Sequence, residues 1–143
     1  MGENYRSGIK LFNEVLGYYM KIVLSLNHAD IIIPRGSEDL AREFYCSFLG
    51  FKEVPKPAEL QKNGGLWLEI SNAQVHLSIQ DGFDPSKTKS HLAYEVSDIS
   101  FLKDELAKRG VKWNDNIPVP GFIRGDIRDP FGNRIEFLQR IKQ

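Results

Sequence analysis

The chain has 143 residues, enough for one compact domain or for two half-size modules that share a core. Its 19 basic and 19 acidic residues cancel, and no basic run alternates with aromatic residues, so we expect small-molecule or protein partners and neither a nucleic acid nor a membrane. A single cysteine, Cys46, excludes an internal disulfide, and no apolar run approaches the roughly 20 residues of a membrane span. These features predict a cytoplasmic protein.

Residues 1–20 do not share the pattern of the rest of the chain. Their apolar side chains could form one face of a helix, and Met20 offers an alternative start. We therefore interpret residues 1–20 as an N-terminal extension without a functional role. The remaining residues, 21–143, are predicted to form a single domain.

The first half of this domain predicts a strand, a helix and three further strands. A β-branched run predicts a strand at 22–33, which Pro34 ends, and Ser37 is a suitable N-cap for a helix that Gly50 ends. The other expected segments are a short strand at 51–54, a loop at 55–65, and a hairpin of strands at 66–70 and 75–79.

The same order returns after a polar connection at 81–89. The expected elements are a strand at 91–96, a helix from Asp98 to Gly110, a short strand at 111–113, a loop at 114–120, and a hairpin of strands at 122–127 and 134–138. We predict an α+β fold made of two βαβββ modules, 21–81 and 89–140.

The repeat also relates individual residues. His28 and His91 each lie in the first strand of a module, and His76 and Glu136 each lie in the last strand. Because side chains two residues apart share a face of a strand, the apolar alternation places all four on the face opposite the helices. A single strand histidine is usually an ordinary hydrogen-bonded residue. Four repeat-related residues on one face instead predict a site for Zn, Ni, Mn or Fe, since imidazole and carboxylate are common ligands of these metals.

Several motifs together resemble the glyoxalase, bleomycin-resistance and extradiol-dioxygenase group, the vicinal oxygen chelate superfamily. The motifs are the helix and turn SEDLAREFYCSFLGF, the hairpin GGLWLEI and VHLSIQ, the strand SHLAYEVSD, and DPFGNRIEF. The resemblance covers about 21–139. It implies a curled eight-stranded mixed sheet around a cavity, with helices on the outer face.

The resemblance also implies a ligand set. His28, His91 and Glu136 occupy the usual metal-ligand positions of the family, and His76 stands where glyoxalase I has a carboxylate ligand. Family members often form homodimers, and some complete each metal site with residues from both chains. A histidine at position 76 removes one negative charge and one potential base, which argues against the glyoxalase I reaction.

The function expected from these residues is that of a glyoxalase-like, metal-dependent enzyme of lyase, isomerase or dioxygenase type. The divalent metal would act as a Lewis acid on a small oxygen-rich molecule. Glu69 or Glu95 could move a proton, and Arg124 or Arg134 could hold an anionic group. Ordinary ion pairs are the competing interpretation for these four.

Two aromatic residues, Trp67 and Phe122, could form an apolar wall of the substrate pocket, to which Arg134 would also contribute. The alternative function is a metal-free protein of the bleomycin-resistance type, which binds a small molecule or an antibiotic. The presence of all four ligand-type residues favours the enzyme.

Overall fold

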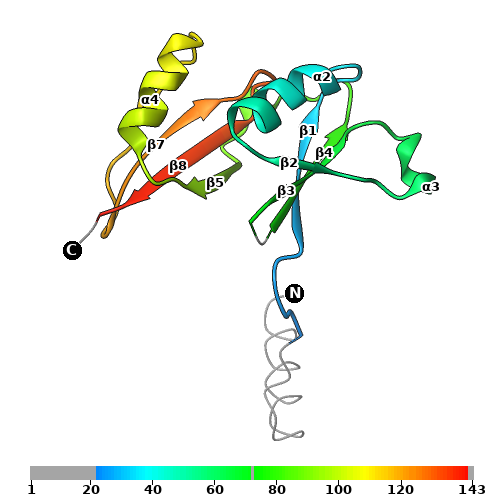
Figure 1. Ribbon diagram of the computed structural model, residues 1–143, viewed down its shortest axis with the longest axis horizontal. Coiled ribbons are helices and arrows are strands. Elements are labelled where there is room, and N and C mark those ends of the chain that lie inside the picture. The colour runs from blue at the N-terminus through cyan, green and yellow to red at the C-terminus, as the bar shows by residue number, and fades with distance from the viewer. Residues whose placement is uncertain (1–21, 72, 142–143) are drawn as a thin grey trace, which may run out of the picture.

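Two four-stranded sheets form the body of the protein in the computed structural model, which describes residues 22–71 and 73–141 (Figure 1). The predicted extension at 1–20 lies outside the described residues. The first sheet has the order β1-β4-β3-β2, with β1 at His28–Ile33, β4 at Ala73–Ile79, β3 at Leu66–Ile70 and β2 at Lys52–Val54. Strand β1 runs parallel to β4, and the other neighbours are antiparallel.

The second sheet repeats this topology. Its order is β5-β8-β7-β6, with β5 at His91–Glu95, β8 at Arg134–Arg140, β7 at Phe122–Arg128 and β6 at Asn114–Asp115. Asp30, two positions after His28, pairs with His76 in the first sheet. Ala93, two positions after His91, pairs with Glu136 in the second. The predicted pair of βαβββ modules is therefore confirmed, and the repeat holds at the level of strand register. No strand pairing joins the two sheets within the described residues, so the eight strands form an open arrangement and not a closed one.

The helices begin close to the predicted positions. The segment after Ser37 consists of α2 at Glu38–Ala41 followed by η1 at Arg42–Phe48, a wider turn in which the amide of Leu49 donates to the carbonyl of Phe44. Asp98 caps α4, Ile99–Lys108, by accepting from the amide of Phe101. Two short helices, α3 at Ala58–Gln61 and η2 at Pro85–Lys87, lie in the predicted loop and in the connection between modules. None of the described helices is long and apolar enough to cross a membrane.

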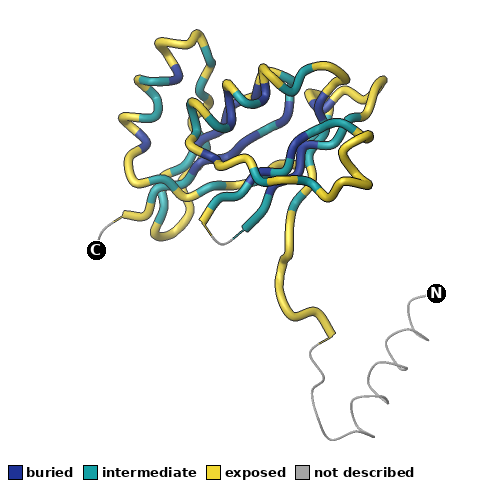
Figure 2. Tube along the Cα trace, turned by 45° about the vertical axis from the view of Figure 1, so that its right-hand side comes forward, coloured by how far each residue is buried: buried dark blue, intermediate teal, exposed yellow. Residues whose placement is uncertain are grey.

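One apolar core serves both modules. Buried residues lie in the interior of the body, and exposed residues lie on its surface loops (Figure 2). The core includes Ile33, Phe44, Tyr45, Leu68, Leu77, Leu106, Ile127, Ile135 and Phe137. The hydroxyl of Tyr45 on η1 donates to the buried Asp129 carboxylate of the second module at 2.6 Å, and the Asn133 amide donates to the carbonyl of Ile32 at 2.9 Å. The modules are thus cross-linked by packing and by buried hydrogen bonds.

Two predicted strands differ from the structure by more than two residues at one end. Strand β1 begins at His28 and not at Ile22, because the parallel strand β4 begins beside this position and offers no partner to earlier residues. Ile22 is therefore 85% exposed. The strand expected at 111–113 is replaced by β6, because the amide of Val111 donates to the carbonyl of Leu106 at the end of α4, and pairing with β7 begins only at Asn114. The ring of Trp113 packs over Gly125, where an added Cβ would lie 2.2 Å from it.

Candidate metal centre

His91 and Glu136 form one half of the candidate site, in the second sheet. His91 Nε2 lies 2.8 Å from Glu136 Oε2, and the Glu136 side chain is almost fully buried. Each residue is held at its other polar atom. His91 Nδ1 lies 2.9 Å from the carbonyl oxygen of Lys89, and Glu136 Oε1 accepts from Arg124 Nη1 at 2.9 Å.

These contacts bring two potential metal-binding atoms, His91 Nε2 and Glu136 Oε2, next to each other. A carbonyl oxygen can only accept, so His91 Nδ1 carries the proton in that contact, and a neutral His91 then presents the lone pair of Nε2 toward the carboxylate. Two acceptor lone pairs 2.8 Å apart repel each other unless a proton lies between them, and a metal ion bound to both atoms at about 2.0–2.2 Å would lie to one side of the line that joins them. An imidazole that donates its second N–H to a carbonyl is also the usual outer-shell arrangement of a metal-binding histidine. The pair therefore fits a divalent metal.

His28 and His76 form the corresponding half in the first sheet. Their rings are stacked, with centroids 4.2 Å apart and an interplanar angle of 18°. His28 Nδ1 lies 2.8 Å from Asn27 Oδ1, which leaves Nε2 of His28 free for a ligand. His76 is buried between His28 and Trp67, whose ring is parallel to it at 4.2 Å. Burial, followed by the charge of His28, lowers the pKa of His76, so this ring is neutral at neutral pH.

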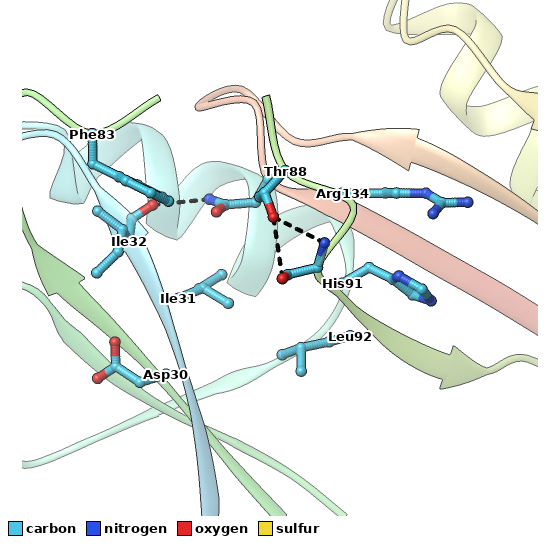
Figure 3. Close-up of a pocket in the computed structure, with 10 residues that line it drawn as sticks. Asp30, Ile31, Ile32, Phe83, Thr88, His91, Leu92 and Arg134 are labelled. Atoms are coloured by element: carbon cyan, nitrogen blue, oxygen red, sulfur yellow. Dashed lines mark hydrogen bonds between the residues drawn. The ribbon is translucent and has the colours of Figure 1, made fainter. Parts of the chain in front are cut away.

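A single copy of the chain does not bring the two halves together. Across the described residues, no group of three or more potential ligands is close enough to hold one ion. Figure 3 shows Ile31 and Leu92 in the space between β1 and β5, with Asp30 on the far side of β1 from His91. His28 shares the face of Asp30, since the two are two residues apart on one strand. The two halves thus face away from each other.

Two clefts lie along the junction of β1 and β5. The smaller, of about 250 Å³, is bordered by Asp30, Phe83, His91 and Arg134 among others. The larger, of about 710 Å³, is bordered by Leu26, Ala29, Val75, Tyr94 and again His91. Both therefore open beside His91, whereas neither is lined by His28 or His76.

The predicted proton-transfer residues lie in ion pairs. Glu95 accepts from Arg140 at 3.1 Å, and Glu69 lies 4.0 Å from Lys52; all four side chains are well exposed. Arg124 contacts Glu136 directly, so its guanidinium is already engaged inside the candidate site.

The predicted pocket residues are also placed. Trp67 forms the outer end of the ring stack, and Phe122 lies beneath the guanidinium of Arg140, whose central carbon is 4.7 Å from the ring centroid. Arg134 donates to Asp126 at 2.6 Å. Burial alone would raise the pKa of Asp126, but hydrogen bonds from Arg134 and from two asparagine side chains outweigh it, and the pKa lies below its ordinary value.

Sequence reasoning missed the groups that orient the histidines. These are the Lys89 carbonyl, the Asn27 side chain and the Gln74 side chain, which lies 3.1 Å from His76 Nε2. A backbone carbonyl leaves no trace in the sequence. Asn27 directly precedes His28, and Gln74 lies two residues before His76. This spacing is the only sequence signal that could have drawn attention to the two side chains.

Comparison with known proteins identifies the family and the fold. Residues 25–137 match the family described as Glyoxalase/Bleomycin resistance protein/Dioxygenase superfamily. A glyoxalase family protein from Bacillus anthracis is 39% identical, with a TM-score of 0.76, over 83% of this chain and 97% of that one. The sequence matches no protein of curated function.

Two more distant structures share the fold. TnmS3, an antibiotic binding protein from Streptomyces, is 20% identical with a TM-score of 0.61, over 83% of this chain and 100% of that one. A mutant of the fosfomycin resistance protein FosX from Listeria monocytogenes, complexed with Mn(II) and a dihydroxypropylphosphonic acid, is 14% identical with a TM-score of 0.65, over 81% of this chain and 90% of that one.

Proposed function

The chain belongs to the glyoxalase, bleomycin resistance protein and dioxygenase superfamily, and we propose that it is a metal-dependent enzyme acting on a small oxygen-rich molecule. In this proposal His91 and Glu136 of one copy and His28 of a second copy hold a divalent ion. The observation that supports it most directly is the position of His91 Nε2 2.8 Å from Oε2 of the buried Glu136, while the other polar atom of each side chain has its own hydrogen-bond partner. A metal ion bound to both atoms would replace this direct contact.

The second copy follows from the way the two modules are joined. The sheets share one core, with Tyr45 bonded to Asp129 and Asn133 bonded to Ile32 across the junction. Bringing the two metal-binding faces together within one chain would break these buried contacts. A homodimer supplies the missing half without disturbing the core, and a symmetric pair would carry two equivalent sites.

The ligand set suits a small oxygen donor. Two neutral imidazoles and one carboxylate leave a bound divalent ion with a net charge of about +1 and with open coordination positions. The ion would supply Lewis-acid polarisation of a carbonyl or hydroxyl oxygen. A Listeria protein of this fold with Mn(II) and a phosphonic acid in its structure supports both the metal and the substrate class.

The protein's own residues prepare this site. Arg124 occupies Oε1 of Glu136 and so leaves only Oε2 for the ion, and the Lys89 carbonyl fixes the tautomer of His91. Trp67 and Phe122 would supply apolar walls, and Glu69 or Glu95 would move a proton after exchanging its ion-pair partner. Lyase, isomerase and dioxygenase chemistry all fit this arrangement.

Metal binding is the direct test. Purified full-length protein would be titrated with Mn²⁺ beside His91→Ala, Glu136→Ala and, as a matched control, Glu59→Ala, which removes an exposed carboxylate on α3. We expect one ion per chain in the wild type and in the control, and a loss of binding in the other two variants. Equal, near-zero metal in all four proteins would remove the enzyme proposal.

The competing function is metal-free binding of a small molecule or an antibiotic. One observation favours it: Arg124, His91 and the buried Glu136 already satisfy one another without an ion. The antibiotic-binding Streptomyces protein of this fold is consistent with such a role. A wild type that binds no Mn²⁺ in the same titration would shift the assignment to this function.

A further inference from the structure

Three aromatic rings are stacked on the face of the first sheet. His76 is the central ring. Trp67 lies on one side at 4.2 Å with an interplanar angle of 2°, and His28 lies on the other at 4.2 Å and 18°. Trp67 and His76 are direct cross-strand partners in β3 and β4. The stack is therefore built on strand register and not on a mobile loop.

A stacked imidazole is poorly placed to share an ion with its neighbour. A metal binds to an imidazole nitrogen near the plane of the ring, at about 2.0–2.1 Å. The His28 and His76 planes are nearly parallel, and their centroids are 4.2 Å apart, so the two planes do not meet within that distance of either ring. One ion cannot lie near both planes without breaking the stack.

The hydrogen bonds also distinguish His76 from His28 and His91. His28 and His91 each use Nδ1 toward an oxygen acceptor, which leaves Nε2 for a metal. His76 instead places Nε2 3.1 Å from Gln74 Oε1, the acceptor of that side chain. His76 is also buried, whereas His28 is exposed. The repeat mates His28 and His91 thus share a ligand-like arrangement that His76 lacks.

We propose that His76 is a positioning residue and not a metal ligand: its ring, supported by Trp67, fixes the plane of the His28 imidazole and aims Nε2 at the ion. This inference rests on the proposed metal site. It replaces the four-residue ligand set expected from the sequence with two histidines and one carboxylate. The two repeat-related positions then have different roles: His76 supports a neighbouring ligand by ring stacking, and Glu136 binds the ion through its carboxylate.

Counting the bound imidazoles tests the proposal. Cu²⁺ would be added to the full-length wild type and to His76→Phe, and electron spin echo envelope modulation would report the number of coordinated imidazole rings. We expect two rings in both proteins. Three rings in the wild type, falling to two in His76→Phe, would overturn the inference while leaving the proposed function intact.

Affinity for Mn²⁺ provides a second measurement. His76→Phe keeps an aromatic ring in the stack, so its affinity should stay within about threefold of wild type. His76→Ala removes the support and should bind about 10–100-fold more weakly, the usual cost of losing an outer-shell partner. A loss of binding in His76→Phe as complete as in His91→Ala would contradict the inference, provided near-UV circular dichroism shows that the variant is folded.

The wild-type copper spectrum does not depend on whether any variant folds. It also separates the proposed metal site from the role of His76. A wild type that binds neither Cu²⁺ nor Mn²⁺ removes the proposed function and this inference together, whereas a wild type with three coordinated imidazoles removes only the role assigned to His76.

Discussion

Mixing two inactive variants should restore metal binding if each site is shared between copies. His28→Ala removes a ligand from one half-site, and Glu136→Ala removes a ligand from the other. Each variant alone lacks a complete set at every site of its homodimer. In a heterodimer of the two, one site receives both substitutions and the other receives none, so one site is intact.

The expected recovery follows from counting. Unfolding an equimolar mixture and refolding it should give about half heterodimers by random pairing, each with one intact site of two, which amounts to about a quarter of the wild-type metal content. Metal analysis after gel filtration would measure it. A matched control uses His91→Ala with Glu136→Ala, which both damage the same half-site, so their heterodimer has no intact site.

Two results would refute this reasoning. If wild type binds one ion per chain but the first mixture recovers none, the site lies within a single chain. If the control mixture recovers as much as the first, His91 and Glu136 do not belong to the same half-site. The second result would also contradict the 2.8 Å contact from which the half-site was built.

Three further predictions concern stability. Tyr45→Phe should lower the free energy of unfolding by about 1–3 kcal/mol in urea titrations, because it removes a donor from the buried Asp129 carboxylate; an unchanged midpoint would contradict the role of this bond. Gly125→Ala should lower the free energy of unfolding by about 1–3 kcal/mol or prevent folding, because the added Cβ would lie 2.2 Å from the Trp113 ring. An unchanged melting temperature in differential scanning calorimetry would show that the ring moves aside freely. Asp126 has a lowered pKa in the folded state, so its stabilising contribution is complete above the unfolded-state pKa of about 3.9 and is lost as the pH falls through the folded value. Asp126→Asn should therefore show a shallower loss of stability in acid than wild type, and parallel acid profiles would count against this assignment.

Much of the architecture could be predicted because it depends on local patterns. Alternation within each strand placed Val75 and Leu77 toward the core and His76 on the opposite face, and the structure confirms this. The match between His28 and His91 predicted the repeat, which the strand register confirms. These signals lie within a few residues of each other in the chain.

The remaining features depend on contacts between distant segments, which no local pattern records. Alternation assigns a face within a sheet but does not say how the two sheets face each other, so it could not show that His28 and His91 point away from one another. The ring of Trp113 packs over Gly125, in another strand, because Gly125 has no side chain to block it. The ring stack likewise depends on the position of Trp67 opposite His76 across a strand pair.

The single core shared by the two modules has a consequence for the segment that connects them. Residues 80–84 are exposed, while beyond them Arg128 donates to the carbonyl oxygens of Pro85 and Thr88 and so fixes the end of the connection to the second module. The association of the halves is therefore carried by side chains and not by chain continuity. A protease cut near Gly82 should leave a nicked protein whose two pieces stay together, and the two modules could be expressed as separate polypeptides that reassemble into the same fold.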